Sequence, residues 1–248
     1  MKDRRRIMFV LPRMNGGGAE RVVSTLSKHL CENYDVTLLV LVSNESFYQL
    51  DSRIHFISAM FEVNRRNKIT RLASLACNFF QAIYFVRKQV KIVSPHIVFS
   101  ILEESDIVTA LALIGLKKIF HISSERNDPE ARNTLIQGIL NRIYRRCDCF
   151  VCQSERVAKY YSSIPDSKKC VIPNPVNFSG YPERIGEGKI KRIVGVGRLK
   201  PQKNFELLID SFGIIAPRYP EVQLDIYGEG TLRKRLQRQI NNLKLEKR

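Results

Sequence analysis

Tryptophan is absent from this chain of 248 residues, and acidic side chains are scarce, with 24 Asp and Glu against 41 Lys and Arg. The formal net charge of +17 predicts an anionic partner. Nucleic acid, an anionic membrane face and a phosphorylated substrate all satisfy that charge. No nucleic-acid-binding motif is present and the basic residues are spread along the chain, so we expect no nucleic-acid partner. A nucleic-acid binder stays an alternative on charge alone.

Long apolar runs are also missing. A membrane-spanning helix needs about 18 consecutive apolar residues, and the nearest stretch, residues 72–86, is interrupted by Asn78 and Gln81. We expect no signal peptide, because the apolar run behind the basic start, residues 7–11, is only as long as a strand. Six cysteines without a secretory signal predict free thiols in a reducing compartment, and hence a cytoplasmic protein.

A dinucleotide fingerprint and a good zinc spacing are lacking too. No glycine loop has the G-x-G-x-x-G spacing, which disfavours the alternative of a NAD-dependent enzyme. Cys147, Cys149 and Cys152 lie close together, with Cys170 further on. Their C-x-C-x-x-C pattern suits zinc poorly, because alternate residues of a strand face opposite ways. We expect buried thiols, no metal and no cofactor.

What the chain does contain is an alternation of short apolar runs with helical patterns, which predicts an α/β fold with parallel sheets. The expected strands are residues 6–11, 36–42, 53–58, 96–100, 118–124, 149–153, 169–172, 192–196 and 223–227. The expected helices are residues 64–92, 106–116, 134–146, 154–161 and 232–243, with two more beginning near residues 18 and 205.

The first candidate site is the polar loop after the strand at 192–196. Gly197 and Arg198 follow the strand, and Lys203 and Asn204 precede a helix. Ligands of parallel α/β units bind where strands end and helices begin, and a helix N-terminus favours anions. The loop therefore predicts a phosphate site. The alternative is that both cations are ordinary solvated surface charges.

A second candidate is the glycine loop between the first strand and the first helix. Gly16, Gly17 and Gly18 turn the chain directly into that helix. Glycines there let the backbone approach a bound group and aim N–H donors at it. A plain flexible turn is the alternative.

Three segments resemble family 4 glycosyltransferases, which are retaining enzymes of the GT-B fold. They are GGGAER at residues 16–21, VIPNPV at 171–176 and VGRLKPQKNFELLIDSF at 196–212, the last with a Gly-x-Gly after the next strand. The resemblance implies one complete Rossmann-like parallel-sheet domain and an incomplete second one. We expect an acceptor-side domain at 1–173, a linker at 174–188 and a partial nucleotide-sugar-binding domain at 189–248.

The resemblance also assigns roles. Gly197, Arg198, Lys203 and Asn204 would bind the donor diphosphate, and the two cations would act in catalysis without a metal. The glycines at 16–18 would lie on the acceptor side.

The segment SERNDP, residues 124–129, resembles a subgroup of the family. Members often place a His near here, beside the reacting sugar. This chain has Arg126 instead, which we expect to be catalytic by pairing with an acceptor phosphate. His121 lies on an apolar face and is expected to be a core histidine.

The implied reaction moves a sugar, with retention, from a nucleotide-diphospho-sugar to a lipid-linked or polysaccharide acceptor in cell-surface glycan synthesis. The helix expected at 64–92 is rich in Phe and has basic ends, which is typical of a helix lying on an anionic membrane. The alternative is a core helix with cationic ends. We expect peripheral contact with the inner face of the cell membrane.

The family pattern continues with two glutamates seven residues apart that hold the donor, and no residue here matches them. A doubly wound domain needs roughly 100 residues, more than remain after Lys189. We therefore expect a truncated chain with weak or no transfer activity of its own. The alternative is an inactive remnant, or a non-catalytic subunit of a split enzyme that binds nucleotide or acceptor beside a missing C-terminal partner chain.

Overall fold

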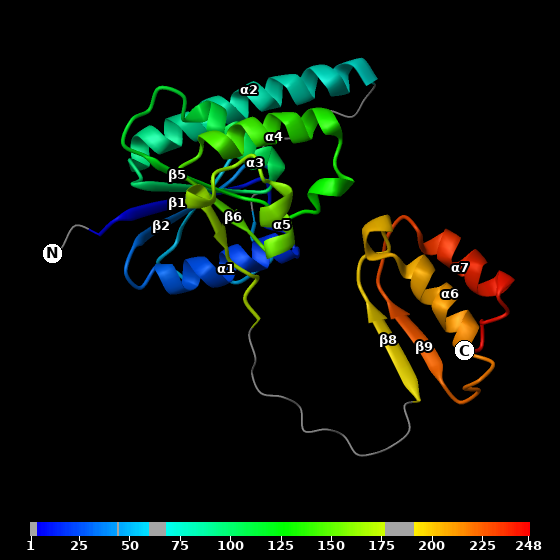
Figure 1. Cartoon of the computed structure of the whole chain (residues 1–248). Helices are drawn as coiled ribbons and strands as arrows, with labels where there is room; N and C mark the ends of the chain where they lie inside the picture. Colours follow the sequence, from blue (N-terminus) through cyan, green and yellow to red (C-terminus); the bar gives the residue numbers. More distant parts are fainter. Residues whose placement is uncertain (1–3, 44, 60–67, 177–190) are drawn as a thin grey trace. The chain divides into compact units, whose positions relative to one another are not determined.

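The computed structural model describes residues 4–43, 45–59, 68–176 and 191–248 (Figure 1). The chain divides into two compact units, Met1–Asn177 and Phe178–Arg248, which we call unit 1 and unit 2. The linker expected at 174–188 falls mostly on 177–190, outside the described residues.

Unit 1 contains a seven-stranded sheet in which every described pairing is parallel, with strand order β3-β2-β1-β4-β5-β6-β7. The strands are β1 (Arg6–Leu11), β2 (Asp35–Val40), β3 (His55–Ser58), β4 (Ile97–Ile101), β5 (Phe120–Ser124), β6 (Cys149–Cys152) and β7 (Lys169–Val171). The strand order reverses between β1 and β4. Ligands of doubly wound folds bind outside the carboxyl ends of the strands at such a reversal.

Helices cover both faces of this sheet, with α1 on one side and α2, α3 and α4 on the other (Figure 1). The helices are α1 (Gly18–Leu30), α2 (Lys68–Val93), α3 (Glu103–Ala112), α4 (Thr134–Arg146) and α5 (Glu155–Tyr160), and short 3₁₀ turns lie at Pro129–Ala131 and Asp166–Lys168. The α/β prediction is therefore confirmed.

The core of unit 1 has two layers because successive residues of a strand face opposite ways. Phe9 of β1 packs with Val23 of α1. Its neighbours Met8 and Val10 pack on the other face with Val86 of α2. Burial on both sides explains why β1 and β2 are continuously apolar.

Several predicted boundaries were wrong in unit 1, most of them by one or two residues and those of one helix by three or four. The helix expected at 106–116 is α3, which begins at Glu103 and ends at Ala112. Acidic side chains in its first turn favour the earlier start, because they stabilise the positive end of the helix dipole. Beyond α3, Gly115 and Lys118 have positive φ of 76° and 69°, so neither the helix nor the next strand extends through them.

Leu102, between β4 and α3, has an unusual backbone conformation, with φ 79° and ψ 148°. That region is essentially restricted to glycine. Ser105 donates a hydrogen bond to the carbonyl oxygen of Leu102 at 2.9 Å, and the amide of Asp106 donates to the same oxygen at 2.9 Å. The start of α3 thus holds a strained residue in place.

Unit 2 has two parallel strands, β8 (Arg192–Val196) and β9 (Gln223–Tyr227), and the helices α6 (Phe205–Ile215) and α7 (Arg233–Asn242), with a 3₁₀ turn at Pro201–Lys203. Both helices lie on the same side of the two strands (Figure 1). Phe205, Ile209 and Leu236 form the core on that side. On the other side Val194, Val196 and Tyr227 are 54%, 77% and 55% exposed. A parallel sheet normally has both faces covered, so unit 2 is an incomplete Rossmann-like unit.

The helix expected at 64–92 is α2, and residues 64–67 lie outside the described residues. Two of its aromatic residues, Phe80 and Tyr84, are about 70% exposed, whereas Val86 and Val90 are buried in the core. One face of α2 therefore packs and another faces solvent. No helix in the described parts of the chain is both long and apolar enough to cross a bilayer.

Candidate anion sites

The loop after β8 leads directly into the exposed N-terminus of α6. Asn204 is the N-cap residue and has a left-handed conformation, φ 50° and ψ 42°, which asparagine tolerates better than most residues. Its side chain makes no capping hydrogen bond. The first N–H groups of a helix have no partner within the helix, so those of α6 remain available to a ligand.

Two cations flank this helix N-terminus. Arg198 follows β8 by two residues and Lys203 ends the 3₁₀ turn, and both are exposed. Within the described residues, neither side chain forms an ion pair. Gly197 lies between strand and loop, and a Cβ there would be 3.6 Å from the Lys203 side chain. The structure thus brings Gly197, Lys203 and Asn204 into one loop with Arg198.

The loop after β9 supports this backbone, and sequence analysis noted that loop only as the Gly-x-Gly of the family resemblance. Leu199 donates its amide hydrogen to the carbonyl of Glu229 at 2.9 Å and accepts from the amide of Leu232 at 3.1 Å. A Cβ on Gly228 would lie 1.8 Å from the carbonyl oxygen of Gly197, and one on Gly230 2.3 Å from that of Leu199. Glycine is therefore required at both positions, because the two loops touch backbone to backbone.

In unit 1, Arg126 follows β5 and lies at the carboxyl edge of the sheet. Its Nη1 donates to Oδ1 of Asn174 at 2.7 Å, and the Asn174 amide donates to Oε1 of Gln153 at 3.2 Å. Arg126, Gln153 and Asn174 follow the neighbouring strands β5, β6 and β7. The Nε of Arg126 is buried and has no partner among the described residues. Burial lowers the pKa of the guanidinium, whereas the charge of Asp106 raises it.

The preceding residue, Glu125, is buried and binds Arg132. The Arg132 Nη1 lies 2.7 Å from Oε2 of Glu125, and their side chains are 5% and 1% exposed. Burial raises the pKa of the Glu125 carboxyl, but the hydrogen bonds and charge of Arg132, together with hydrogen bonds from the Asn127 amide and Tyr161, hold that pKa below its ordinary value. Sequence analysis did not single out this pair, because nothing in the sequence pairs residues seven apart in a loop.

His121 is buried, as expected, but its surroundings are polar rather than apolar. Its Nε2 lies 3.1 Å from the hydroxyl oxygen of Ser100, and that hydroxyl donates to Asp106 at 2.5 Å. Burial lowers the pKa of His121 to about 4 and raises the pKa of Asp106 well above its ordinary value. The prediction of an apolar face was wrong, because Ser100 of β4 and Ser123 of β5 both place a hydroxyl beside the His121 ring. With Asp106 fully buried, the cluster is structural.

The glycine loop at the start of α1 has ordinary backbone geometry. Gly17 is the N-cap residue, with an extended φ of −99° and ψ of 169° that any residue adopts. The carboxylate of Glu20 lies against Gly17, close enough that a Cβ would be 2.2 Å from its Oε2. Tyr48 donates its hydroxyl to the Gly17 carbonyl at 2.8 Å, and the Phe47 ring lies 3.2 Å from a Cβ placed on Gly16. Gly18 has open space around it. A carboxylate thus lies beside this helix N-terminus, where an anionic ligand would have to displace it.

The cysteines do not gather into a ligand set. Sγ of Cys149 lies 3.8 Å from Sγ of Cys170 on the adjacent strand. Cys147 and Cys152 are buried, whereas Cys170 is exposed, so the expectation of buried thiols was wrong for Cys170. In the described parts of the chain, no three His, Cys, Asp or Glu residues are placed to hold a metal ion.

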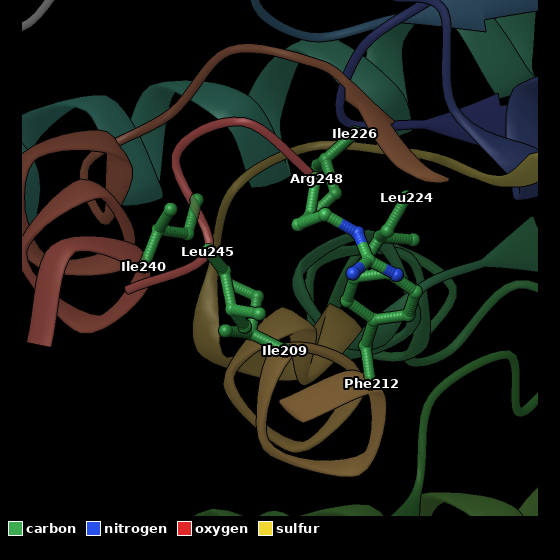
Figure 2. Close-up of a pocket in the computed structure, with 7 residues that line it drawn as sticks. All are labelled: Ile209, Phe212, Leu224, Ile226, Ile240, Leu245 and Arg248. Atoms are coloured by element: carbon green, nitrogen blue, oxygen red, sulfur yellow. The ribbon is translucent and has the colours of Figure 1, made fainter. Parts of the chain in front are cut away.

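An apolar hollow of about 160 Å³ lies in unit 2 (Figure 2). Its lining residues are Ile209, Phe212, Leu224, Ile226, Ile240, Leu245 and Arg248. The Arg248 guanidinium donates to the carbonyl oxygens of Tyr219 at 2.7 Å and Val222 at 3.0 Å, so the one charge in the hollow is already bound to backbone. The hollow contains neither Arg198 nor Lys203 and is a gap in the core.

A complete Rossmann-like sheet followed by an incomplete second one is the GT-B class of architecture. The chain matches Glycosyltransferase Family 4 over residues 16–179 and Glycosyl transferases group 1 over residues 182–248. It therefore belongs to glycosyltransferase family 4, and the recognition made from GGGAER, VIPNPV and the residue 196–212 segment is confirmed.

Similar proteins agree with this assignment. The chain is 24% identical over 242 residues to the GalNAc-alpha-(1->4)-GalNAc-alpha-(1->3)-diNAcBac-PP-undecaprenol alpha-1,4-N-acetyl-D-galactosaminyltransferase of Campylobacter jejuni, with 96% of this chain and 65% of that protein covered. It is 26% identical to the amylovoran biosynthesis glycosyltransferase AmsD of Erwinia amylovora, covering 94% of this chain and 64% of that protein. The chain thus spans about 65% of the length of these relatives.

A solved structure shares the fold. HepE of Anabaena, solved in complex with UDP and glucose, superposes with a TM-score of 0.68 at 15% identity, covering 98% of this chain and 68% of that one. The chain is a glycosyltransferase-family protein whose relatives act in bacterial glycan or exopolysaccharide synthesis.

Proposed function

We propose that this chain serves transfer of a sugar, with retention, from a nucleotide-diphospho-sugar to a lipid-linked or polysaccharide acceptor. The observation that carries the proposal is the N-terminus of α6, which lacks a side-chain cap and has Arg198 and Lys203 beside it. Free N–H groups and two cations without ion pairs among the described residues suit a diphosphate.

In this proposal the cations also serve the chemistry. Negative charge grows on the β-phosphate of the nucleotide as the bond to the anomeric carbon breaks. Arg198 and Lys203 would stabilise that charge, a role for which preorganised donors are well suited. Two cations and a helix N-terminus can do this without a metal ion, so we propose metal-independent transfer.

Arg126 is the proposed acceptor-side residue. Its guanidinium has one buried nitrogen without a described partner and lies where ligands of such sheets bind. A relative that acts on an undecaprenol diphosphate glycan supports an acceptor with a charged phosphate group. The glycines at 16–18 follow β1 at the same carboxyl edge, and we propose that they lie on the acceptor side, where Gly18 has open space around it.

A lipid-linked acceptor would place the protein at a membrane surface. The exposed apolar side chains of unit 1 include Phe80 and Tyr84 of α2 and Leu135 of α4, which are 69%, 70% and 74% exposed. With a net charge of +17, such a surface suits an anionic membrane. We propose peripheral contact with the cytoplasmic face of the cell membrane.

A second candidate is a remnant, or a subunit that binds nucleotide or acceptor without transfer. The uncovered sheet face of unit 2, at Val194, Val196 and Tyr227, favours it, because an incomplete unit orients the anomeric carbon poorly. Binding of a nucleotide diphosphate without sugar transfer would favour this candidate over an enzyme.

Calorimetric titration of UDP and GDP tests the donor site. The double variant Arg198→Ala/Lys203→Ala should lose at least tenfold in affinity for the nucleotide that binds. The double variant Arg218→Ala/Lys234→Ala removes one Arg and one Lys from exposed positions of the same unit and should bind as the parent does. Equal losses of affinity in both variants would show that net charge, and not this loop, binds the nucleotide. An unchanged titration of the first variant would refute the donor site.

A further inference from the structure

The buried ion pair of unit 1 lies next to the proposed acceptor residue. Arg132 reaches Glu125 with two nitrogens, Nη1 to Oε2 at 2.7 Å and Nη2 to Oε1 at 3.0 Å. This two-pronged geometry is directional as well as strong. The pair closes the loop between β5 and the 3₁₀ turn at Pro129–Ala131.

The same carboxylate also holds the backbone that carries Arg126. Oε1 of Glu125 accepts the amide hydrogens of Arg126 and Asn127, each at 3.0 Å. One oxygen of Glu125 thus receives two backbone donors and one guanidinium donor. The direction in which the chain leaves β5, and hence the base of the Arg126 side chain, depends on this carboxylate.

Residues of α3 and α4 and the residue that follows α5 hold the pair from outside the loop. The Arg132 Nε donates to Oε2 of Glu103 at 2.5 Å, and its Nη1 donates to Oε1 of Gln137 at 3.0 Å. The Tyr161 hydroxyl donates to Oε2 of Glu125 at 2.7 Å. Glu103 belongs to α3 and Gln137 to α4, and Tyr161 follows α5 directly. The pair is therefore tied to the frame of unit 1 rather than to its own loop alone.

A buried ion pair is a poor device for stability. The cost of removing two charges from water is large, and well-packed apolar residues of similar volume often replace such pairs without loss. A different benefit is needed to explain why the loop contains one. That benefit is a fixed geometry, because a group that binds a ligand must be held in position within a fraction of an ångström.

We propose that Glu125 and Arg132 are positioning residues that hold Arg126 ready for the anionic group of the acceptor. The proposal rests on the proposed acceptor role of Arg126. The pair itself would touch no ligand, because both side chains are almost fully buried.

The chain offers a matched control in the same loop. Arg156 pairs with Glu130 at 2.7 Å, with side chains 75% and 55% exposed. This pair has the same charges and joins the same loop to α5, but it makes no contact with the Arg126 backbone in the described structure. Each single substitution in this pair changes the net charge by one, as the corresponding substitution in the buried pair does.

The test uses the full chain in the Arg198→Ala/Lys203→Ala background, so that the donor cations do not contribute. Inorganic pyrophosphate is titrated by calorimetry at a temperature where circular dichroism shows a folded protein. Arg126→Ala should weaken binding at least tenfold, and Arg132→Met and Glu125→Gln at least fivefold. Arg132→Lys, which keeps the charge without the two-pronged geometry, should show an intermediate loss. Glu130→Gln and Arg156→Gln should bind within twofold of the parent.

A merely structural role predicts something else. It would lower the unfolding temperature of the Glu125 and Arg132 variants while the folded protein binds pyrophosphate within twofold of the parent, and that result overturns the proposal. Should Arg132→Met fail to fold, Arg132→Lys and Glu125→Gln decide the question. Unchanged binding by Arg126→Ala would refute the acceptor role of Arg126 as well, whereas loss with Arg126→Ala alone refutes only the positioning.

Discussion

At the scale of single residues, charge matters less than the setting in which a charge is held. Arg198 and Lys203 are exposed and lie beside free helix N–H groups, whereas Arg132 is buried against Glu125. Lysines and arginines are abundant in this chain, with 41 in all, so abundance alone does not mark a site. The local backbone therefore identifies the candidate ligands of an anion.

His121 is the residue whose pH behaviour can be stated most clearly. Burial lowers its pKa in the folded protein to about 4, against an ordinary value of 6.5. Between these values the unfolded chain binds a proton that the folded chain does not, so stability falls as the pH drops from about 6.5 to 4. The nearby charge of Asp148, which raises this pKa, limits the effect.

His121→Gln should therefore flatten the acid side of the stability profile. Each pKa unit is worth about 1.4 kcal/mol, so the parent should lose about 2–3 kcal/mol more than the variant between pH 7 and pH 4.5. Urea unfolding at both pH values measures the difference. Parallel profiles for the parent and the variant would contradict the assignment of this slope to His121.

At the scale of elements, the loop after β9 determines the shape of the loop after β8. Alanine at Gly228 or Gly230 would place a Cβ less than 2.5 Å from a carbonyl oxygen of that loop. Because backbone cannot move aside as a flexible side chain can, we expect each substitution to destabilise unit 2 by about 1–3 kcal/mol.

Nucleotide binding should weaken in the same two variants, since Arg198 lies between the contacted residues Gly197 and Leu199. Gly213→Ala in α6 is the control: its Cβ would meet only side-chain carbons at 3.5 Å or more, and alanine favours a helix. Urea unfolding and UDP calorimetry measure both effects. Nucleotide affinity equal to that of the parent in Gly228→Ala would show that the two loops are not coupled.

The exposed face of α2 carries the membrane prediction. Phe80→Asp and Tyr84→Asp should each reduce binding to vesicles of anionic lipid severalfold. Each substitution removes an apolar side chain that would insert into the membrane and adds a negative charge that anionic lipid repels. Ile214→Asp, at a residue of α6 that is 81% exposed, is the matched control in unit 2. Vesicle sedimentation measures the fraction of protein bound. Equal losses of vesicle binding in Ile214→Asp and Phe80→Asp would indicate that net charge alone, and not the exposed face of α2, determines binding.

Most elements could be predicted from sequence because they follow strong local patterns. The strands β1, β8 and β9 and the helix α4 begin and end at the predicted residues. The limits of α3 were predicted less well, although its first turn carries the acidic side chains that favour a helix start. The Glu125–Arg132 pair and the polar surroundings of His121 were missed because both depend on how the chain folds in space: the pair joins residues seven apart in one loop, and His121 meets Ser100 of the neighbouring strand β4.

At the scale of the whole molecule, the two units differ in how much core they possess. Unit 1 buries both faces of the central strands of a seven-stranded sheet, whereas unit 2 buries one face of two strands. A small core stabilises a domain only marginally. The two units should therefore open independently.

Hydrogen exchange should detect that difference. We expect amides of β8 and α6 to exchange at least tenfold faster than those of β1 and β4, because opening a small unit costs less free energy. Mass spectrometry of peptides from each unit measures the rates, with and without UDP. UDP should slow exchange in unit 2 alone. Equal protection of β8 and β4 without ligand would contradict the expected difference.

The conformation of Leu102 links substitutions in α3 to the carboxyl edge of the sheet in unit 1. Its backbone is unfavourable by itself and persists only while Ser105 and Asp106 bind its carbonyl oxygen. If those hydrogen bonds were lost, the backbone at Leu102 would relax toward an ordinary conformation and shift the end of β4. A polar substitution far from any ligand could then disable the sheet's carboxyl edge, so an inactivating mutation at Ser105 would be no proof of catalysis.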